Sequence, residues 1–96
     1  MGASAPNTVS FAIRGPISRA DLRGLSDRVR RLLTERGPDV AICDVHGVEA
    51  DAVAVDALCR LQLGARRCGC QIRLRHASEE LLELVAFMGL TEVLPD

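Results

Sequence analysis

The sequence contains no tryptophan, tyrosine or lysine, and its only aromatic side chains are Phe11 and Phe87. Two aromatics are too few for the stacking platforms that bind single-stranded nucleic acid, so this class of binding site is excluded. The twelve basic residues are all arginine, and they are balanced by 13 acidic residues to a net charge of −1. A broad positive surface for nucleic acid is therefore not expected either.

Long apolar runs are missing as well. No run approaches the roughly 20 residues that a membrane-spanning helix needs. Residues 1–7 lack the positive and apolar segments of a secretory signal. The four cysteines are therefore expected to be free thiols in a reducing cytoplasm. They are Cys43, Cys59, Cys68 and Cys70.

What is present is the composition of one soluble globular domain. The chain has 96 residues, of which 48% are hydrophobic and 26% charged. This length is enough for one hydrophobic core and too short for two. We expect residues 1–7 to form a flexible N-terminus and residues 8–96 to form the domain.

Hydrophobic periodicity predicts six alternating elements. Alternating or continuous apolar residues predict strands over residues 8–14, 39–45 and 71–76. Helical spacing of apolar residues predicts helices over residues 19–36, 52–67 and 79–88. The run at residues 40–43 is typical of a strand covered on both faces. The order β-α-β-α-β-α predicts an α/β domain with a mostly parallel sheet.

Short-range signals support the helix boundaries. Ser18 stands three residues before Asp21, a spacing typical of a capping box. Asp51 and Ser78 are good N-caps for the second and third helices. After the third helix, the apolar residues of the tail are expected to pack back on the core: Leu90, Val93 and Leu94.

The middle of the chain resembles a known family. Residues 44–48 (DVHGV) followed by residues 50–58 (ADAVAVDAL) are similar to the central motif of STAS domains, where a strand, a Gly-containing loop and an Asp-Ser pair lead into a helix. Residues 14–18 (RGPIS) and 71–74 (QIRL) resemble two further family segments. The resemblance extends over residues 8–95. It implies a STAS-like fold, with a mixed and mostly parallel sheet, and a non-catalytic protein-binding role.

One position departs from the family pattern. Asp51 matches the motif's aspartate, but Ala52 stands where phosphorylated members carry serine. The preceding loop is about one residue shorter than in the family, so the register could shift by one. Such a shift restores no hydroxyl, because no serine or threonine lies between Thr34 and Ser78. The resemblance therefore implies a domain that is not phosphorylated at the usual site.

The same resemblance implies a chain that is similar to an anti-sigma factor antagonist, with a kinase-type anti-sigma factor or another regulatory protein as its partner. The alternatives are a STAS-type accessory subunit of a bacterial ABC transporter, or a small-molecule-binding module or enzyme. No nucleic acid or membrane insertion is predicted, and a homodimer is left open. The predicted contact surface consists of Pro16, Ser18, Asp51, Ala52, Val53, Ala54 and Asp56.

At the start of the second helix, small apolar groups stand where a helix end should meet solvent, at Ala50, Ala52, Val53 and Ala54. Exposed apolar groups mark contact surfaces, and the alternative is that Val53 and Ala54 pack under the neighbouring loop.

No catalytic, metal or cofactor site is predicted. The Cys68-Gly69-Cys70 pair lacks the second pair of ligands that a zinc site needs. Cys43 and His46 are expected on opposite faces, which does not favour a nucleophile and its base. The carboxylates of Asp44, Asp51 and Asp56 are interpreted as caps and solvated groups.

Overall fold

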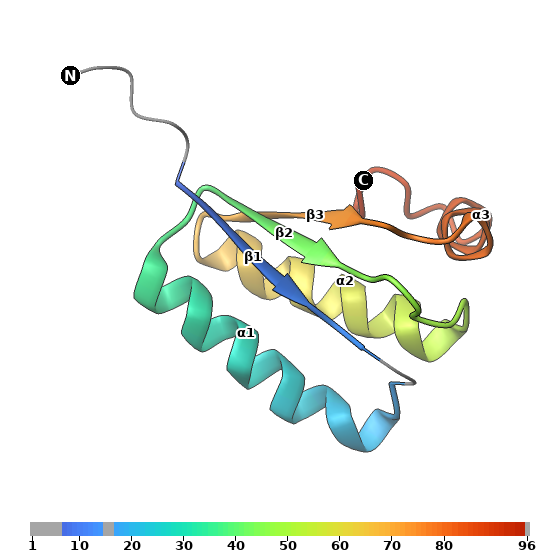
Figure 1. Ribbon diagram of the computed structural model, residues 1–96, viewed down its shortest axis with the longest axis horizontal. Helices are drawn as coiled ribbons and strands as arrows, with labels where there is room; N and C mark the ends of the chain where they lie inside the picture. Colours follow the sequence, from blue (N-terminus) through green and yellow to red (C-terminus); the bar gives the residue numbers. More distant parts are fainter. Residues whose placement is uncertain (1–6, 15–16, 96) are drawn as a thin grey trace.

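The computed structural model describes residues 7–14 and 17–95, and residues 1–6 of the predicted flexible N-terminus lie outside this range. The predicted order β-α-β-α-β-α is confirmed, with one short 3-10 turn before the first helix (Figure 1). The elements are β1 (Thr8–Ala12), η1 (Arg19–Asp21), α1 (Leu22–Arg36), β2 (Val40–Asp44), α2 (Ala52–Arg67), β3 (Gln71–Arg75) and α3 (Glu79–Phe87).

The three described strands form one parallel sheet in the order β1-β2-β3. Val40 of β2 lies opposite Thr8 of β1 and Gln71 of β3, which fixes the register of the whole sheet. A helix connects each strand to the next, because neighbouring parallel strands need a long crossover connection. The carboxyl ends of all three strands therefore lie along the same edge.

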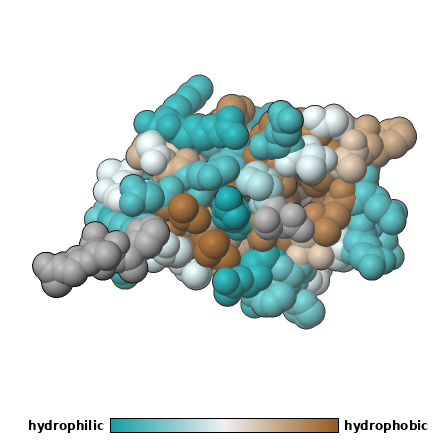
Figure 2. All heavy atoms as spheres, turned by 90° about the horizontal axis from the view of Figure 1, so that it is seen from above, coloured by the Kyte–Doolittle hydropathy of each residue, from teal (hydrophilic) through white to brown (hydrophobic). Residues whose placement is uncertain are grey.

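The sheet is covered by helices on one face. α1 and α2 lie side by side below it, and α3 lies beyond the end of β3 (Figure 1). Ala41 and Cys43 of β2 point to the helices and are fully buried, whereas Val40 and Ile42 are only half-buried. The predicted coverage of β2 on both faces is therefore wrong for the described part of the chain. Figure 2 looks onto the open face, where hydrophobic atoms lie among hydrophilic ones.

The predicted helix starts are confirmed at two positions. The Asp51 carboxylate accepts a hydrogen bond from the Ala54 N–H at 2.8 Å, and the Ser78 hydroxyl accepts one from the Leu81 N–H at 3.1 Å. Each bond satisfies a backbone donor that has no partner within the helix. At the other end of α1, Gly37 has a φ of 58°, which glycine adopts without a steric penalty.

A buried glutamine closes the free edge of β3. The side chain of Gln62 in α2 is fully buried, and its Nε2 donates to the carbonyl oxygens of Ile72 (2.9 Å) and Val93 (2.8 Å). Its Oε1 accepts from the Ile72 N–H at 2.8 Å. The C-terminal tail also bonds to this edge of β3, because the Leu74 N–H donates to Pro95 O at 2.9 Å.

The tail packs back as expected. Leu94 is 2% exposed, and Leu90 and Val93 are partly buried against the core.

Candidate partner-binding surface

The segments that follow β1, β2 and β3 lie at the carboxyl edge of the sheet (Figure 1). In open α/β sheets, ligands bind outside this edge. The β2–α2 loop leads directly into the helix that carries most of the predicted contact residues. Ser18 follows β1, the neighbour of β2, so its segment begins at the same edge.

The β2–α2 loop is a tight turn. The Asp44 carboxylate accepts from the His46 backbone N–H at 2.9 Å, and the Val48 N–H donates to Val45 O at 3.0 Å. Gly47 adopts a φ of 82° within this turn, and Val48 is buried beneath it. This geometry holds the chain so that Asp51 caps α2.

Four of the predicted contact residues come together at the start of α2. Ala52 is exposed, and Asp51, Val53 and Asp56 are half-buried at the surface. Asp56 also forms an ion pair with Arg60 one turn later, at 3.0 Å. The result is a small patch in which Ala52 and Val53 lie between the carboxylates of Asp51 and Asp56 in the sequence.

Ala54 does not belong to this patch. It is 2% exposed and packs in the core with Val55 and Leu58. The reason is helical phase, because residues 54 and 58 are one turn apart and share the face that meets the sheet. The prediction that Ala54 is a surface contact is therefore wrong, and the alternative of packing inside the domain holds for this residue.

The two remaining predicted contacts lie between β1 and α1. Pro16 lies outside the described residues. Ser18 is exposed, and its hydroxyl donates to the Asp21 carboxylate at 2.7 Å while its backbone N–H donates to the same oxygen at 3.2 Å. The Ser18 hydroxyl bond, followed by the backbone bond, lowers the pKa of Asp21. The predicted capping box is therefore formed, although regular α-helix begins only at Leu22.

The sequence reasoning missed a polar group at the ends of the strands. Asp44 lies 3.3 Å from the Nδ1 of His76 and 3.8 Å from the guanidinium of Arg14. The pKa of Asp44 is lowered, first by the backbone hydrogen bond from His46 and then by His76 and Arg14. The rings of His46 and His76 are 6.3 Å apart and nearly perpendicular.

One sequence signal could have found this group. Arg14, Asp44 and His76 each stand at or just after the end of a predicted parallel strand, so they had to meet at one edge. Among the described residues, no three or more His, Cys, Asp or Glu side chains are grouped so that they could hold a metal ion.

The thiol of Cys43 lies in the core of the domain. Burial, and to a smaller extent Asp44, raises the pKa of the Cys43 thiol to about 12, so it is neutral at physiological pH. All four cysteines are free thiols, with Cys68 exposed and Cys70 buried at the turn between α2 and β3.

Comparisons with known proteins identify the family. A family model described as "Mlab, STAS domain" matches residues 2–95. The chain belongs to the STAS domain family. The crystal structure of a sulfate transporter family protein from Wolinella succinogenes has the same fold as this STAS domain, with a TM-score of 0.66 at 24% identity. The match covers 97% of this chain and 75% of that chain. A search of curated proteins finds no match.

Family membership confirms the resemblance seen in the sequence. STAS domains are protein-interaction modules. In this STAS domain, the Asp-Ser position of the family motif is Asp51-Ala52, at the N-terminus of α2. None of the helices in the part of the chain that the structure describes is long and apolar enough to cross a bilayer.

Proposed function

We propose that this STAS domain is a non-catalytic regulatory module that resembles an anti-sigma factor antagonist and docks a protein partner through the start of α2. The observation that carries the proposal is the exposed methyl group of Ala52 at the first residue of α2. The proposed contact residues are Ser18, Asp51, Ala52, Val53 and Asp56, with Pro16 next to them in sequence. The partner is a kinase-type anti-sigma factor or a related cytoplasmic regulator.

The physical argument concerns phosphorylation. A phosphoserine at this helix start would add nearly two negative charges beside the Asp51 carboxylate and disrupt a docked partner. Alanine carries no oxygen that can form a phosphoester. The hydroxyls of Ser18 and Ser78, which follow β1 and β3, are already hydrogen-bonded in the helix starts of η1 and α3. The docking surface is therefore proposed to be constitutive.

The test is binding of the purified chain to kinase-type anti-sigma factors of the same organism, with and without ATP. We expect binding to be unchanged by ATP, and the mass of the chain to gain no phosphoryl group. Ala52→Asp places the missing charge at the surface and should weaken binding at least about tenfold. Ala86→Asp makes the same change at an exposed position of α3 and serves as the control.

Two results would contradict the proposal. One is a phosphoryl group on the wild-type chain near residue 52 after incubation with kinase and ATP. The other is binding that Ala52→Asp leaves at the wild-type level, because the partner would then dock elsewhere.

A second candidate is an accessory subunit of a bacterial ABC transporter. The description of the matching family model, which names an MlaB-type STAS domain, favours it. In that case the same α2 surface would rest on the ATPase subunit and act structurally. Co-purification with a membrane-associated ATPase, lost in Ala52→Asp, would favour this candidate over a cytoplasmic kinase-type partner.

A further inference from the structure

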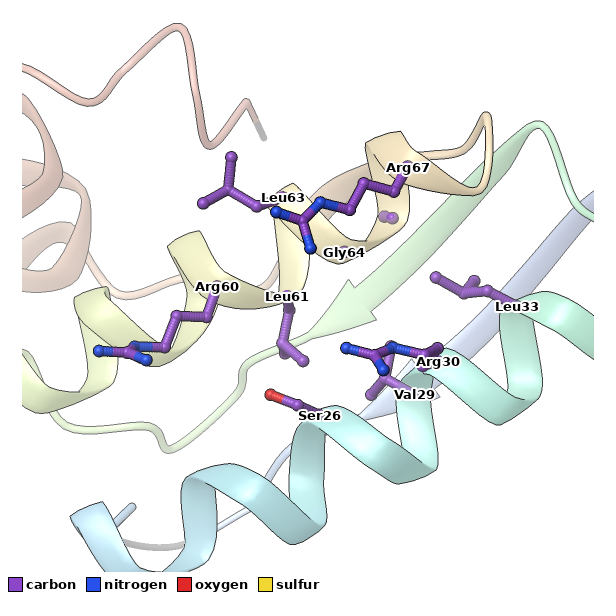
Figure 3. Close-up of a pocket in the computed structure, with 10 residues that line it drawn as sticks. Ser26, Val29, Arg30, Leu33, Arg60, Leu61, Leu63, Gly64 and Arg67 are labelled. Atoms are coloured by element: carbon purple, nitrogen blue, oxygen red, sulfur yellow. The ribbon is translucent and has the colours of Figure 1, made fainter.

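A groove runs between α1 and α2. It encloses about 300 Å³. Its floor is apolar and belongs to the core, because Val29, Leu33 and Leu61 are all nearly fully buried. Figure 3 shows the Leu61 side chain pointing from α2 toward α1, with Arg30 on one side of the gap and Arg67 on the other.

The rim of the groove is strongly positive. Arg30, Arg60 and Arg67 are exposed around it, and a neighbouring hollow along η1 and α1 adds Arg19 and Arg23. Asp27 is the single acidic residue among the described residues that line the two hollows. Five arginines against one aspartate is a local excess in a chain whose net charge is −1. Of these arginines, only Arg60 has an ion pair within the described residues, with Asp56.

Packing inside the domain does not account for the shape of the groove. Gly64 lines it from the last turn of α2, and glycine within a helix costs about 1 kcal/mol relative to alanine. A Cβ added at Gly64 would meet no atom within 4 Å, so no neighbour in the chain requires glycine there. Leu63 beside it is 56% exposed. An apolar ridge can therefore approach α2 closely at this point.

We propose that this groove binds an amphipathic, acidic helix of a partner protein. The apolar ridge of such a helix would lie on the groove floor, and its carboxylates would pair with the arginines on both rims. From Leu22 to Leu33 the lining of α1 rises about 17 Å, which matches a helix of about 11 residues. This mode of recognition uses apolar anchors at positions i, i+4 and i+7.

The headgroups of an anionic membrane would pair with the arginines of the rim, but the membrane would not contact the apolar residues of the groove floor. The apolar residues are recessed between two helices, whereas a peripheral membrane site presents its apolar residues outward. Ala52 does not line the groove. The peptide test below and the Ala52→Asp test of the proposed function can therefore fail independently.

The test uses the full chain and a fluorescein-labelled helical peptide of about 15 residues. The peptide carries leucine at i, i+4, i+7 and i+11, with glutamate on both flanks and no basic residues. We expect saturable binding in fluorescence anisotropy that weakens as salt is added, because the rim contacts are exposed. Arg30→Glu and Arg67→Glu should each weaken binding about tenfold. Arg73→Glu, an exposed arginine of β3, should change it less than about twofold.

Filling the groove gives a second, uncharged test. Gly64→Leu replaces glycine with a better helix former, so α2 is kept, and the side chain occupies the groove. We expect it to abolish peptide binding, while Ala52→Asp retains it. Circular dichroism melts check that each variant is folded.

Four outcomes would overturn the proposal. They are absence of saturable binding up to about 1 mM peptide, equal binding of a scrambled peptide without the apolar ridge, and equal loss of binding in Arg73→Glu. The fourth is arginine-dependent binding to vesicles of equal parts phosphatidylglycerol and phosphatidylcholine without binding to the peptide.

Discussion

Replacing Gln62 with leucine should strongly destabilise the domain, although the two side chains are similar in size. The Gln62 side chain makes three hydrogen bonds to backbone groups, at 2.8 Å to 2.9 Å, and none of its polar atoms lacks a partner. Leucine has a similar volume but can neither donate nor accept. The N–H and C=O of Ile72, on the outer edge of β3, would be left buried without partners.

The magnitude follows from these contacts. Each buried group without a partner costs about 1–3 kcal/mol, so the two groups of Ile72 cost about 2–6 kcal/mol together. The Val93 carbonyl is only partly buried and can turn to water. Burial of the leucine side chain offsets about 1–2 kcal/mol. The free energy of unfolding should fall by about 2–3 kcal/mol at the centre of these ranges and by up to about 5 kcal/mol, out of about 5–14 kcal/mol for a domain of this length.

Urea denaturation followed by circular dichroism measures this loss. A loss of 2 kcal/mol corresponds to a fall in Tm of at least about 8 °C for a domain of this size. Gln71→Leu is the matched control, because Gln71 begins β3, is half-buried and makes no side-chain hydrogen bond among the described residues. It should change stability by no more than about 0.5 kcal/mol. Equal stability of Gln62→Leu and the control would refute the role given to Gln62.

Three further predictions concern single side chains. Asp51→Ala removes the cap on Ala54 N–H and should lower the free energy of unfolding by about 1 kcal/mol in urea titrations, and an unchanged midpoint would contradict this. Because the pKa of Cys43 is raised to about 12, this thiol should not react with Ellman's reagent in the folded protein at pH 8, whereas the exposed Cys68 should react readily; rapid loss of both thiols would contradict this. The folded-state pKa of Asp44 is lowered, so its stabilisation is complete above the unfolded value of about 3.9 and is lost as the pH falls through the folded value. The wild type should exceed Asp44→Asn in stability near neutral pH and lose this advantage in acid, and an advantage that persists at the lowest pH would contradict the assignment.

The sequence was sufficient for the fold because the signals for it are local. The apolar stripe Val55, Leu58, Leu61 and Ala65 marks α2, and all four residues are buried. The caps at Asp51 and Ser78 act within three residues, so no tertiary information is needed to see them. The start of α1 shifted from residue 19 to Leu22 because the turn at Ser18 first closes as a 3-10 helix.

Other features depend on contacts between distant residues. Gln62 bonds to Ile72 and Val93, ten and 31 positions away, and a glutamine within an apolar stripe is easily taken for a solvated residue. Asp44 and His76 meet only because β2 and β3 pair in a particular register. The open face of the sheet follows from α1 and α2 lying on the same side, which periodicity in β2 alone does not determine.

Helical phase connects the two proposed surfaces. Along α2, residues 52, 56, 60, 63 and 67 fall within roughly a quarter-turn of one another and face away from the core. Ala52 and Asp56 belong to the partner-binding surface, while Arg60, Leu63 and Arg67 belong to the rim of the groove. A single partner could therefore extend along one stripe of α2 from its start to its end. If it does, Ala52→Asp and Arg67→Glu would show coupled, non-additive effects on binding of the natural partner. If two independent partners bind, each variant should weaken the binding of only one of them.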